Sequence, residues 1–199
     1  MKKKWTDRLY IFTILLFALG FFNIIYAWLG FACMTIPFIL LARDGRKTWC
    51  HKYCPRASFF TVLFRGKVKN SKPVPKWLTG NNAKTFFLVY FSINLFILFM
   101  STLMVFRGRM EAMEKVRFMI AFQLPWNMPQ LINISTIPNW AVHLSFRVYS
   151  MMFTITVIGL VLGLLYKPRT WCTVCPVNTL SDMVIEKKVS QGFLIYKTR

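Results

Sequence analysis

The stretch 9–42, LYIFTILLFALGFFNIIYAWLGFACMTIPFILLA, contains 34 residues without a formal charge. As a single helix it would be roughly 51 Å long, whereas the hydrocarbon core of a bilayer is about 30 Å thick. Two short membrane spans with a turn near residues 23–29 fit this stretch better. Two further apolar blocks, at 86–106 and 148–166, each have the length of one span. The sequence therefore predicts an all-α integral membrane protein with four transmembrane helices.

The composition favours a membrane protein over a soluble enzyme. Hydrophobic residues make up 56% and charged residues 16% of the 199 residues, whereas a soluble domain has about 25% charged residues. The net charge is nevertheless +20, from 26 Lys and Arg against 6 Asp and Glu. Such an excess is typical of nucleic-acid-binding proteins or of loops that face anionic lipid. Because no nucleic-acid-binding motif accompanies the charge, we expect membrane lipid and no nucleic acid as a partner.

The positions of the basic residues predict the orientation in the membrane. With four spans, 21 of the Lys and Arg residues lie on one face, in segments 1–8, 43–84 and 167–199, and five lie on the other face, in 107–147. Basic loops stay in the cytoplasm. We therefore expect a multi-pass protein of the inner or plasma membrane with both termini cytoplasmic. Within the outer segment, 109–122 has the pattern of an interfacial amphipathic helix, and a loop at the membrane interface is expected to follow it, up to residue 146.

One cysteine motif occurs twice, each time after a predicted pair of spans. It reads KTWCHKYCP at 47–55 and RTWCTVCP at 169–176. Both copies consist of a basic residue, Thr, Trp, Cys, a short spacer, Cys and Pro. The repeat divides the chain into two pseudo-repeats, 1–75 and 76–199, each with two spans and a cysteine pair on the cytoplasmic face.

The two motifs together predict one metal site. Their cysteines would lie on the same side of the membrane, and four thiolates are the usual ligands of a [4Fe-4S] cluster or a structural zinc. A Cys-Pro pair is more typical of iron–sulfur loops, and the proline predicts a helix start directly after each second cysteine. One [4Fe-4S] cluster is therefore the expected cofactor, with zinc or redox thiols as alternatives. The expected ligands are Cys50, Cys54, Cys172 and Cys175. Cys33, within the first apolar stretch, is expected to be a core residue.

The tandem W-C-x2/3-C-P pattern resembles the polyferredoxin-like membrane proteins. That group includes the membrane quinol-dehydrogenase subunit of periplasmic nitrate reduction, the membrane regulator of nitrous-oxide reduction and a cytochrome-oxidase assembly protein. The resemblance covers the four-span core and implies that the four motif cysteines carry an iron–sulfur centre and that the protein passes electrons at the membrane. Many members use C-x3-C-P twice and carry a soluble ferredoxin domain, so this chain resembles the bare membrane module.

Residues near the expected ligands are candidates for tuning the site and for docking a partner. Trp49 and Trp171 can shield a cluster at the membrane interface. His51 can ligate metal or bond to a cluster sulfide, with a solvated side chain as the alternative. The basic loop beside the motifs can steer an acidic ferredoxin- or flavodoxin-like carrier. The lysines expected to form this docking surface are Lys67, Lys69 and Lys72.

The expected function is electron transfer at the membrane. The protein would relay electrons between quinone or a membrane partner and a cytoplasmic carrier or redox partner subunit, and the sequence leaves open whether it is the electron-transfer subunit of an oxidoreductase. Quinone is an open second cofactor, because no segment carries a specific signature for it. The alternative function is a structural or assembly subunit in which iron–sulfur or zinc holds the two halves together.

Overall fold

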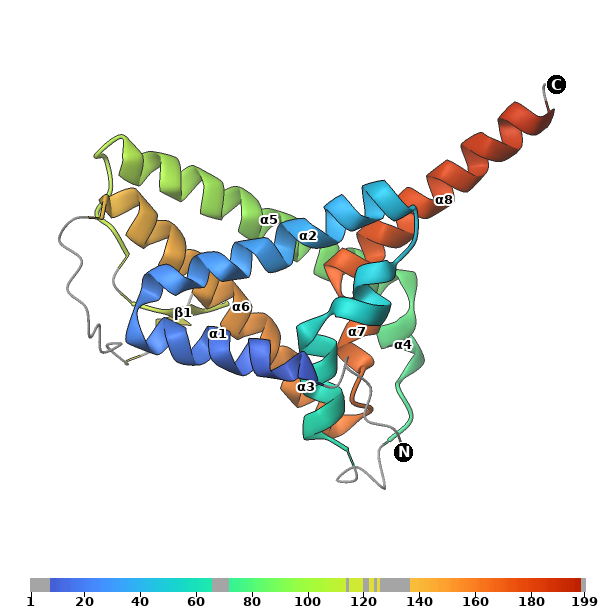
Figure 1. Ribbon diagram of the computed structural model, residues 1–199, viewed down its shortest axis with the longest axis horizontal. Helices are drawn as coiled ribbons and strands as arrows, with labels where there is room; N and C mark the ends of the chain where they lie inside the picture. Colours follow the sequence, from blue (N-terminus) through green and yellow to red (C-terminus); the bar gives the residue numbers. More distant parts are fainter. Residues whose placement is uncertain are drawn as a thin grey trace.

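The computed structural model describes residues 8–65, 72–113, 115–119, 122–123, 125 and 137–197, without the side chains of 187–197. The described chain is mostly helical (Figure 1). Its longer helices are α1 (Tyr10–Phe22), α2 (Trp28–Asp44), α3 (Pro55–Leu63), α5 (Asn81–Phe106), α6 (Asn139–Leu165) and α8 (Pro176–Lys197). The short helical turns are η2 (Ile24–Ala27), η3 (Trp49–Tyr53), α4 (Lys76–Thr79) and α7 (Thr170–Val174), and a strand pair is formed by β1 (Arg117–Phe118) and β2 (Phe122–Gln123).

Among the described residues, three segments are long and apolar enough to cross a membrane. They are Ile24–Asp44, which combines η2 and α2, and the helices α5 and α6. The helix α1 is also apolar but has 13 residues, which gives it a length of only about 20 Å. The fold is thus compatible with a membrane protein, and the first of the four predicted spans corresponds to a shorter helix.

The first apolar stretch divides at the predicted turn. The helix α1 ends at Phe22, and Asn23 has an extended backbone with φ −157° and ψ 124°. The Oδ1 atom of Asn23 accepts a hydrogen bond from the Ile25 N–H at 3.0 Å. An asparagine side chain competes with helical hydrogen bonds in this way, so α1 stops there and α2 runs back from the turn, diverging from α1 (Figure 1). The hairpin packs on α6, where the missing side chain of Gly20 leaves room for the ring of Tyr149.

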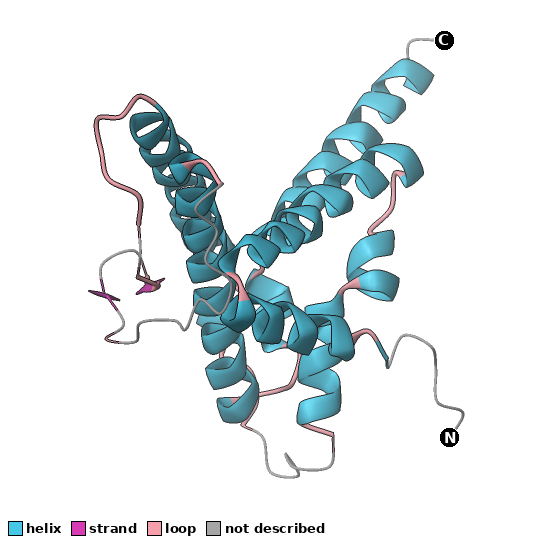
Figure 2. Cartoon of the chain, turned by 60° about the vertical axis from the view of Figure 1, so that its left-hand side comes forward, coloured by secondary structure: helices cyan, strands magenta, loops and turns pink. Residues whose placement is uncertain are grey.

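The prediction of an amphipathic helix at 109–122 is wrong. The chain turns at Gly108, with φ 70°, and then forms β1 and β2 as an antiparallel pair. Side chains of α6 bind the backbone of this segment, as where the Arg117 N–H donates to Ser150 Oγ at 3.0 Å. These bonds replace the ones that a helix would form within itself. The strand pair lies on the side of the molecule away from the C-terminus (Figure 2).

The helix α6 begins at Asn139, earlier than the expected end of the interfacial loop at residue 146. Its first turns contain His143, which is fully buried. His143 Nδ1 accepts a hydrogen bond from the Met113 N–H at 3.1 Å, so Nε2 carries the proton and donates to Ser101 Oγ, also at 3.1 Å. Polar residues such as His143 lower the hydropathy of the first turns of α6. These turns are nevertheless helical, since Ser101 of α5 and Met113 of the outer segment form hydrogen bonds with the buried His143 side chain.

The helix α3 of the first half packs closely on α6 of the second half. A Cβ atom on Gly159 would lie 2.7 Å from Cε2 of Phe60, and one on Gly163 would lie 2.5 Å from Cε2 of Phe64. Small residues spaced by four allow helices in membranes to approach each other closely. This contact brings the first cysteine motif, which directly precedes α3, toward the second motif, which follows α6.

Candidate metal centre

The first cysteine motif forms a π-helical turn, η3, followed directly by α3. The Cys54 N–H donates to the Trp49 carbonyl at 2.9 Å, a bond between residues five apart that characterises this wide turn. Cys54 has an extended backbone with φ −66° and ψ 107°, and Pro55 is the first residue of α3. Proline suits this position because the first N–H groups of a helix have no partner within the helix. The predicted helix start after this cysteine is confirmed.

The second motif reaches the same arrangement with a spacer that is one residue shorter. Cys172 lies within α7, Cys175 has an extended backbone with φ −60° and ψ 126°, and α8 begins at Pro176. The Thr179 N–H donates to the carbonyl of Cys175 at 3.0 Å. The π-helical turn of the first motif therefore accommodates its extra residue, so that each second cysteine lies just before the first turn of a helix.

All the expected ligands line one cavity of about 110 Å³. A water molecule needs roughly 10–15 Å³ of such a cavity, so this one can hold a group of several atoms. Two cysteines come from the turn before α3 and two from the turn before α8. The cysteines that line it are Cys33, Cys50, Cys54, Cys172 and Cys175, all of them free thiols.

Burial favours the protonated form of Cys50, Cys172 and Cys175 when no metal is bound. Burial raises the pKa of Cys50 to about 11 and that of Cys172 to about 12, and the other motif cysteines add to both shifts. Burial also raises the pKa of Cys175, while the backbone N–H of Asn178 and the charge of Arg56 oppose this increase. Metal binding to such thiols has to release protons.

Residues beyond the predicted set also line this cavity, and Arg56, Cys33 and Asn178 are the ones among them that bear on its chemistry. Arg56 lines it, and its Nη2 donates to the sulfur of Met152 at 2.6 Å. A cation beside thiolates stabilises their charge. The sequence signal that identifies Arg56 is its position directly after the first Cys-Pro pair. Cys33 and Asn178 also line the cavity. Cys33 packs against the buried cluster that contains Leu98, as expected for a core residue, and borders the cavity as well.

The predicted neighbours of the ligands differ in their positions. Trp49 and Trp171 both line the cavity, and the ring of Trp171 packs edge-on against Phe87 with centroids 5.5 Å apart. His51 is exposed and is not among the lining residues. His51 is therefore a solvated side chain, which is the alternative to a role at the metal. The two tryptophans lie where a shielding role requires them.

The expected docking lysines lie only partly within the described chain. Lys67 and Lys69 lie outside the described residues, and Lys72 is exposed in the segment that leads to α4. An exposed Lys72 remains accessible to a partner protein.

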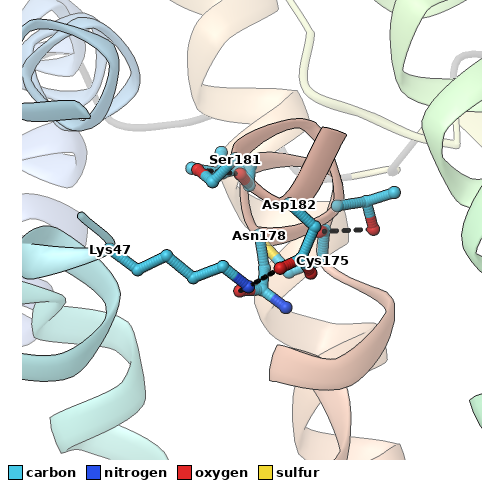
Figure 3. Close-up of polar contacts among 7 residues, drawn as sticks. Lys47, Cys175, Asn178, Ser181 and Asp182 are labelled. Carbon is cyan, nitrogen blue, oxygen red and sulfur yellow. Dashed lines mark hydrogen bonds and ion pairs between the residues drawn. The ribbon is translucent and has the colours of Figure 1, made fainter. Parts of the chain in front are cut away.

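Lys47 of the first motif contacts the helix that follows the second motif. Its Nζ donates to Asn178 Oδ1 at 3.0 Å and forms an ion pair with Asp182, both on α8 (Figure 3). Cys175 lies next to these contacts, at the start of the same helix. The side chain thus links the two motifs beside the cavity.

Arg169, the residue of the second motif that corresponds to Lys47, makes the reciprocal contact. Its Nε donates at 3.2 Å to the hydroxyl oxygen of Thr61 on α3. Thr61 and Asp182 are each the sixth residue after the proline of their motif. Each motif is therefore connected to the helix that follows the other motif through equivalent positions.

The donor set fits a polynuclear cluster better than a single ion. Within the described part of the chain, no group of three or more His, Cys, Asp or Glu residues is placed to hold one metal ion. Four sulfur ligands of a zinc ion all lie about 2.3 Å from it. Four thiols that line a larger cavity without converging on one point match a cluster with several iron atoms, in which each iron takes its own cysteine.

The comparison with protein families agrees with this chemistry. The family model of a 4Fe-4S binding domain matches residues 26–73 and 149–191. The first match contains α2, the first motif and α3, and the second contains most of α6, the second motif and much of α8. These matches support an iron–sulfur protein family and indicate a 4Fe-4S cluster binding domain. No curated protein and no solved structure shows a significant match to the chain.

Proposed function

We propose that this protein is a membrane electron-transfer module that holds one [4Fe-4S] cluster through the cysteines of both motifs. The observation that carries the proposal is the single cavity lined by Cys50, Cys54, Cys172 and Cys175 beside membrane-length helices. When bound, a [4Fe-4S] cluster supplies one-electron transfer, while the protein supplies position and electrostatics.

The chain's own residues would adjust the site in two ways. Arg56 places a permanent positive charge beside Cys175, which favours the more negative, reduced state of a bound centre. The indole rings of Trp49 and Trp171 cover the cavity with apolar surface and limit access of water.

We also propose the membrane arrangement that the charges predict. The protein has four spans in two pseudo-repeats, with α1 as the first span, and both termini and both motifs are cytoplasmic. Support comes from the 21 basic residues in the three predicted cytoplasmic segments against five in 107–147, of which Arg147 lies within α6. The reciprocal contacts of Lys47 and Arg169 support two equivalent halves.

A partner must supply the other end of the electron path. The motif cysteines lie just before α3 and just before α8, on the face proposed as cytoplasmic, whereas the bilayer core is about 30 Å thick. The proposed donor or acceptor in the membrane is quinone or a redox subunit, and the cytoplasmic partner is a ferredoxin- or flavodoxin-like carrier. Attraction of an acidic carrier by Lys67, Lys69 and Lys72 should weaken with salt, because the Debye length falls to about 8 Å at physiological ionic strength.

The decisive experiment combines spectroscopy with electron transfer. Anaerobically purified protein should show visible absorbance and, after reduction, an EPR signal of a [4Fe-4S] cluster, with about four irons per chain. Reduced ferredoxin should reduce the cluster, more slowly in high salt and after reversal of the three lysines to Glu. Zinc without iron, or a cluster that neither ferredoxin nor quinol reduces, would contradict the proposal.

A structural or assembly subunit is the second candidate. It is favoured by the origin of the ligands, because each half contributes two cysteines to one cavity and a bound cluster would join the halves. In that case removal of the cluster would unfold the protein, and no carrier would exchange electrons with it.

A further inference from the structure

A second cavity, of about 50 Å³, is lined by residues of α5 and α6. Much of its wall is apolar and includes Leu98. It shares part of this wall with the cysteine cavity, but none of the motif cysteines lines it. The residues that line both cavities are Phe91, Ile155, Trp171 and Pro176.

This cavity is lined by residues whose buried hydrogen-bond donors have no partner among the described residues. In the part of the chain that the structure describes, the buried side-chain nitrogen and oxygen atoms without a hydrogen bond are Tyr90 Oη, Arg117 Nε, Arg147 Nε and Trp171 Nε1. All four residues line the second cavity. Native proteins pair nearly all buried polar groups, so four exceptions in one place require an explanation. Since each of the four can donate a proton, a group with acceptor oxygens would pair with them.

Two of these donors carry a permanent positive charge. Arg147 lies eight residues, or about 12 Å, from the start of the candidate span α6. Arg117 is held beside α6 by its N–H bond to Ser150, and the two guanidinium groups are close enough to repel each other. Among the described residues, no carboxylate forms an ion pair with either arginine. Charged residues at membrane depth normally have an opposite charge nearby, which points to an anion.

The lining of the cavity combines two arginines with a longer, mostly apolar wall. Its lining extends along α6 from Arg147 to Ile158, and eleven residues of helix span about 16 Å. The arginines lie toward one end, and the apolar side chains continue beyond them. A free inorganic anion would occupy only the charged end, whereas a molecule with a hydrocarbon chain would also cover the apolar wall.

We propose that this second cavity binds an anionic amphiphile, with the phosphate of a membrane phospholipid held by Arg117 and Arg147. The acyl chain lies along the apolar wall between α5 and α6, and Tyr90 provides a further donor to the ligand oxygens. This site shares a wall with the cysteine cavity but contains none of the motif cysteines, and lipid binding should not require a bound cluster.

The test is lipid binding to the delipidated full-length protein in detergent, measured by native mass spectrometry. The probes are dioleoyl phosphatidic acid, dioleoylglycerol, which lacks only the phosphate, and inorganic phosphate. Wild type should retain one phosphatidic acid and neither of the other two. Arg117→Gln and Arg147→Gln should each weaken binding about tenfold, the loss expected for a charge-assisted hydrogen bond. The matched controls Arg107→Gln and Arg109→Gln should bind normally, because both arginines are exposed and do not line the cavity.

Further outcomes decide against the proposal. Equal binding of dioleoylglycerol would overturn the role of the phosphate, and inorganic phosphate that binds as tightly as the lipid would assign the site to a free anion. A neutral quinone that displaces the lipid and binds the arginine variants as well as wild type would assign the cavity to quinone.

Two variants keep the test valid if the arginine variants fold poorly. Tyr90→Phe removes one hydroxyl group and should weaken lipid binding without changing Tm. Glu114→Gln tests for a partner within the chain. If Glu114→Gln lowers Tm while wild type binds no lipid, the arginines are neutralised by the protein itself and the proposal is wrong.

Discussion

Lys47 forms an ion pair with Asp182 and thereby links the first cysteine motif to the helix after the second. The side chain of Asp182 is 40% exposed and that of Lys47 19% exposed. Because such a pair is partly screened by water, it should contribute about 1 kcal/mol or less. Its position beside the cavity nevertheless makes it a probe of how the two halves are joined.

Charge reversal tests this link. Lys47→Glu should lower Tm by a few degrees and reduce the iron content, because it places like charges together beside the cavity. The double variant Lys47→Glu with Asp182→Lys should restore both. If the double variant is no better than the single one, the ion pair does not join the halves in the native protein.

Cluster content tests the four proposed ligands. Cys50→Ser, Cys54→Ser, Cys172→Ser and Cys175→Ser should each lose the [4Fe-4S] absorbance, because each removes one thiolate of the set. Cys33→Ser and His51→Ala should keep about four irons per chain. Iron loss in Cys33→Ser comparable to that in the motif variants would make Cys33 a ligand, and its place at the cavity wall makes the comparison informative.

The charge of Arg56 should tune the redox potential. Arg56→Gln removes a cation beside Cys175 but keeps a polar side chain of similar length. The reduced cluster loses electrostatic stabilisation, so the potential in a spectroelectrochemical titration should become more negative. Arg65→Gln, on an exposed residue that does not line the cavity, is the control. An unchanged potential in Arg56→Gln would remove the tuning role.

The pKa values predict slow alkylation of the cluster-free protein. At pH 8, Cys50, with its pKa of about 11, should have about a hundredfold less thiolate than a thiol with the ordinary value of 9.0. Its reaction with iodoacetamide should therefore be slow and should accelerate as the pH rises through about 11. The control is Lys72→Cys, which places a thiol at an exposed position. Equal rates at both positions would show that Cys50 is not desolvated.

Packing of α3 on α6 should tolerate no side chain at Gly159. Gly159→Ala places a Cβ against Phe60, which is fully buried, and such overpacking costs about 1–3 kcal/mol. Thermal denaturation in detergent should show this loss, and Phe60→Leu should relieve part of it in the double variant. Gly80→Ala is the matched control, since its Cβ would meet only backbone oxygens at 3.4 Å or more. A stable Gly159→Ala protein would mean that the two helices lie further apart.

Local sequence determined the helical framework and the identity of the candidate ligands. The apolar blocks are long enough to predict their helices, since segment length and hydropathy are properties of consecutive residues. The break at Asn23 follows from a side chain that bonds to the neighbouring backbone, and the helix starts at Pro55 and Pro176 follow from the geometry of proline.

Tertiary contacts decided the outer segment, against its local pattern. The residues 109–122 have amphipathic helical periodicity. Their backbone N–H groups nevertheless donate to side chains of α6, and these bonds hold the segment in a non-helical conformation. The Arg117 N–H donates to Ser150 and the Met113 N–H donates to His143, and each partner is about thirty residues away in sequence. Periodicity within one segment contains no information about hydroxyl and imidazole groups on another helix.

The surroundings of both cavities were likewise decided by the fold alone. The sequence identified four cysteines by their repeat, but Cys33 and Arg56 reach the same cavity only because α2 and α3 pack beside the second motif. Arg117 and Arg147 come together only because β1 docks on α6. A repeated motif is visible along the chain, whereas the neighbours of a site depend on which distant helices pack against it.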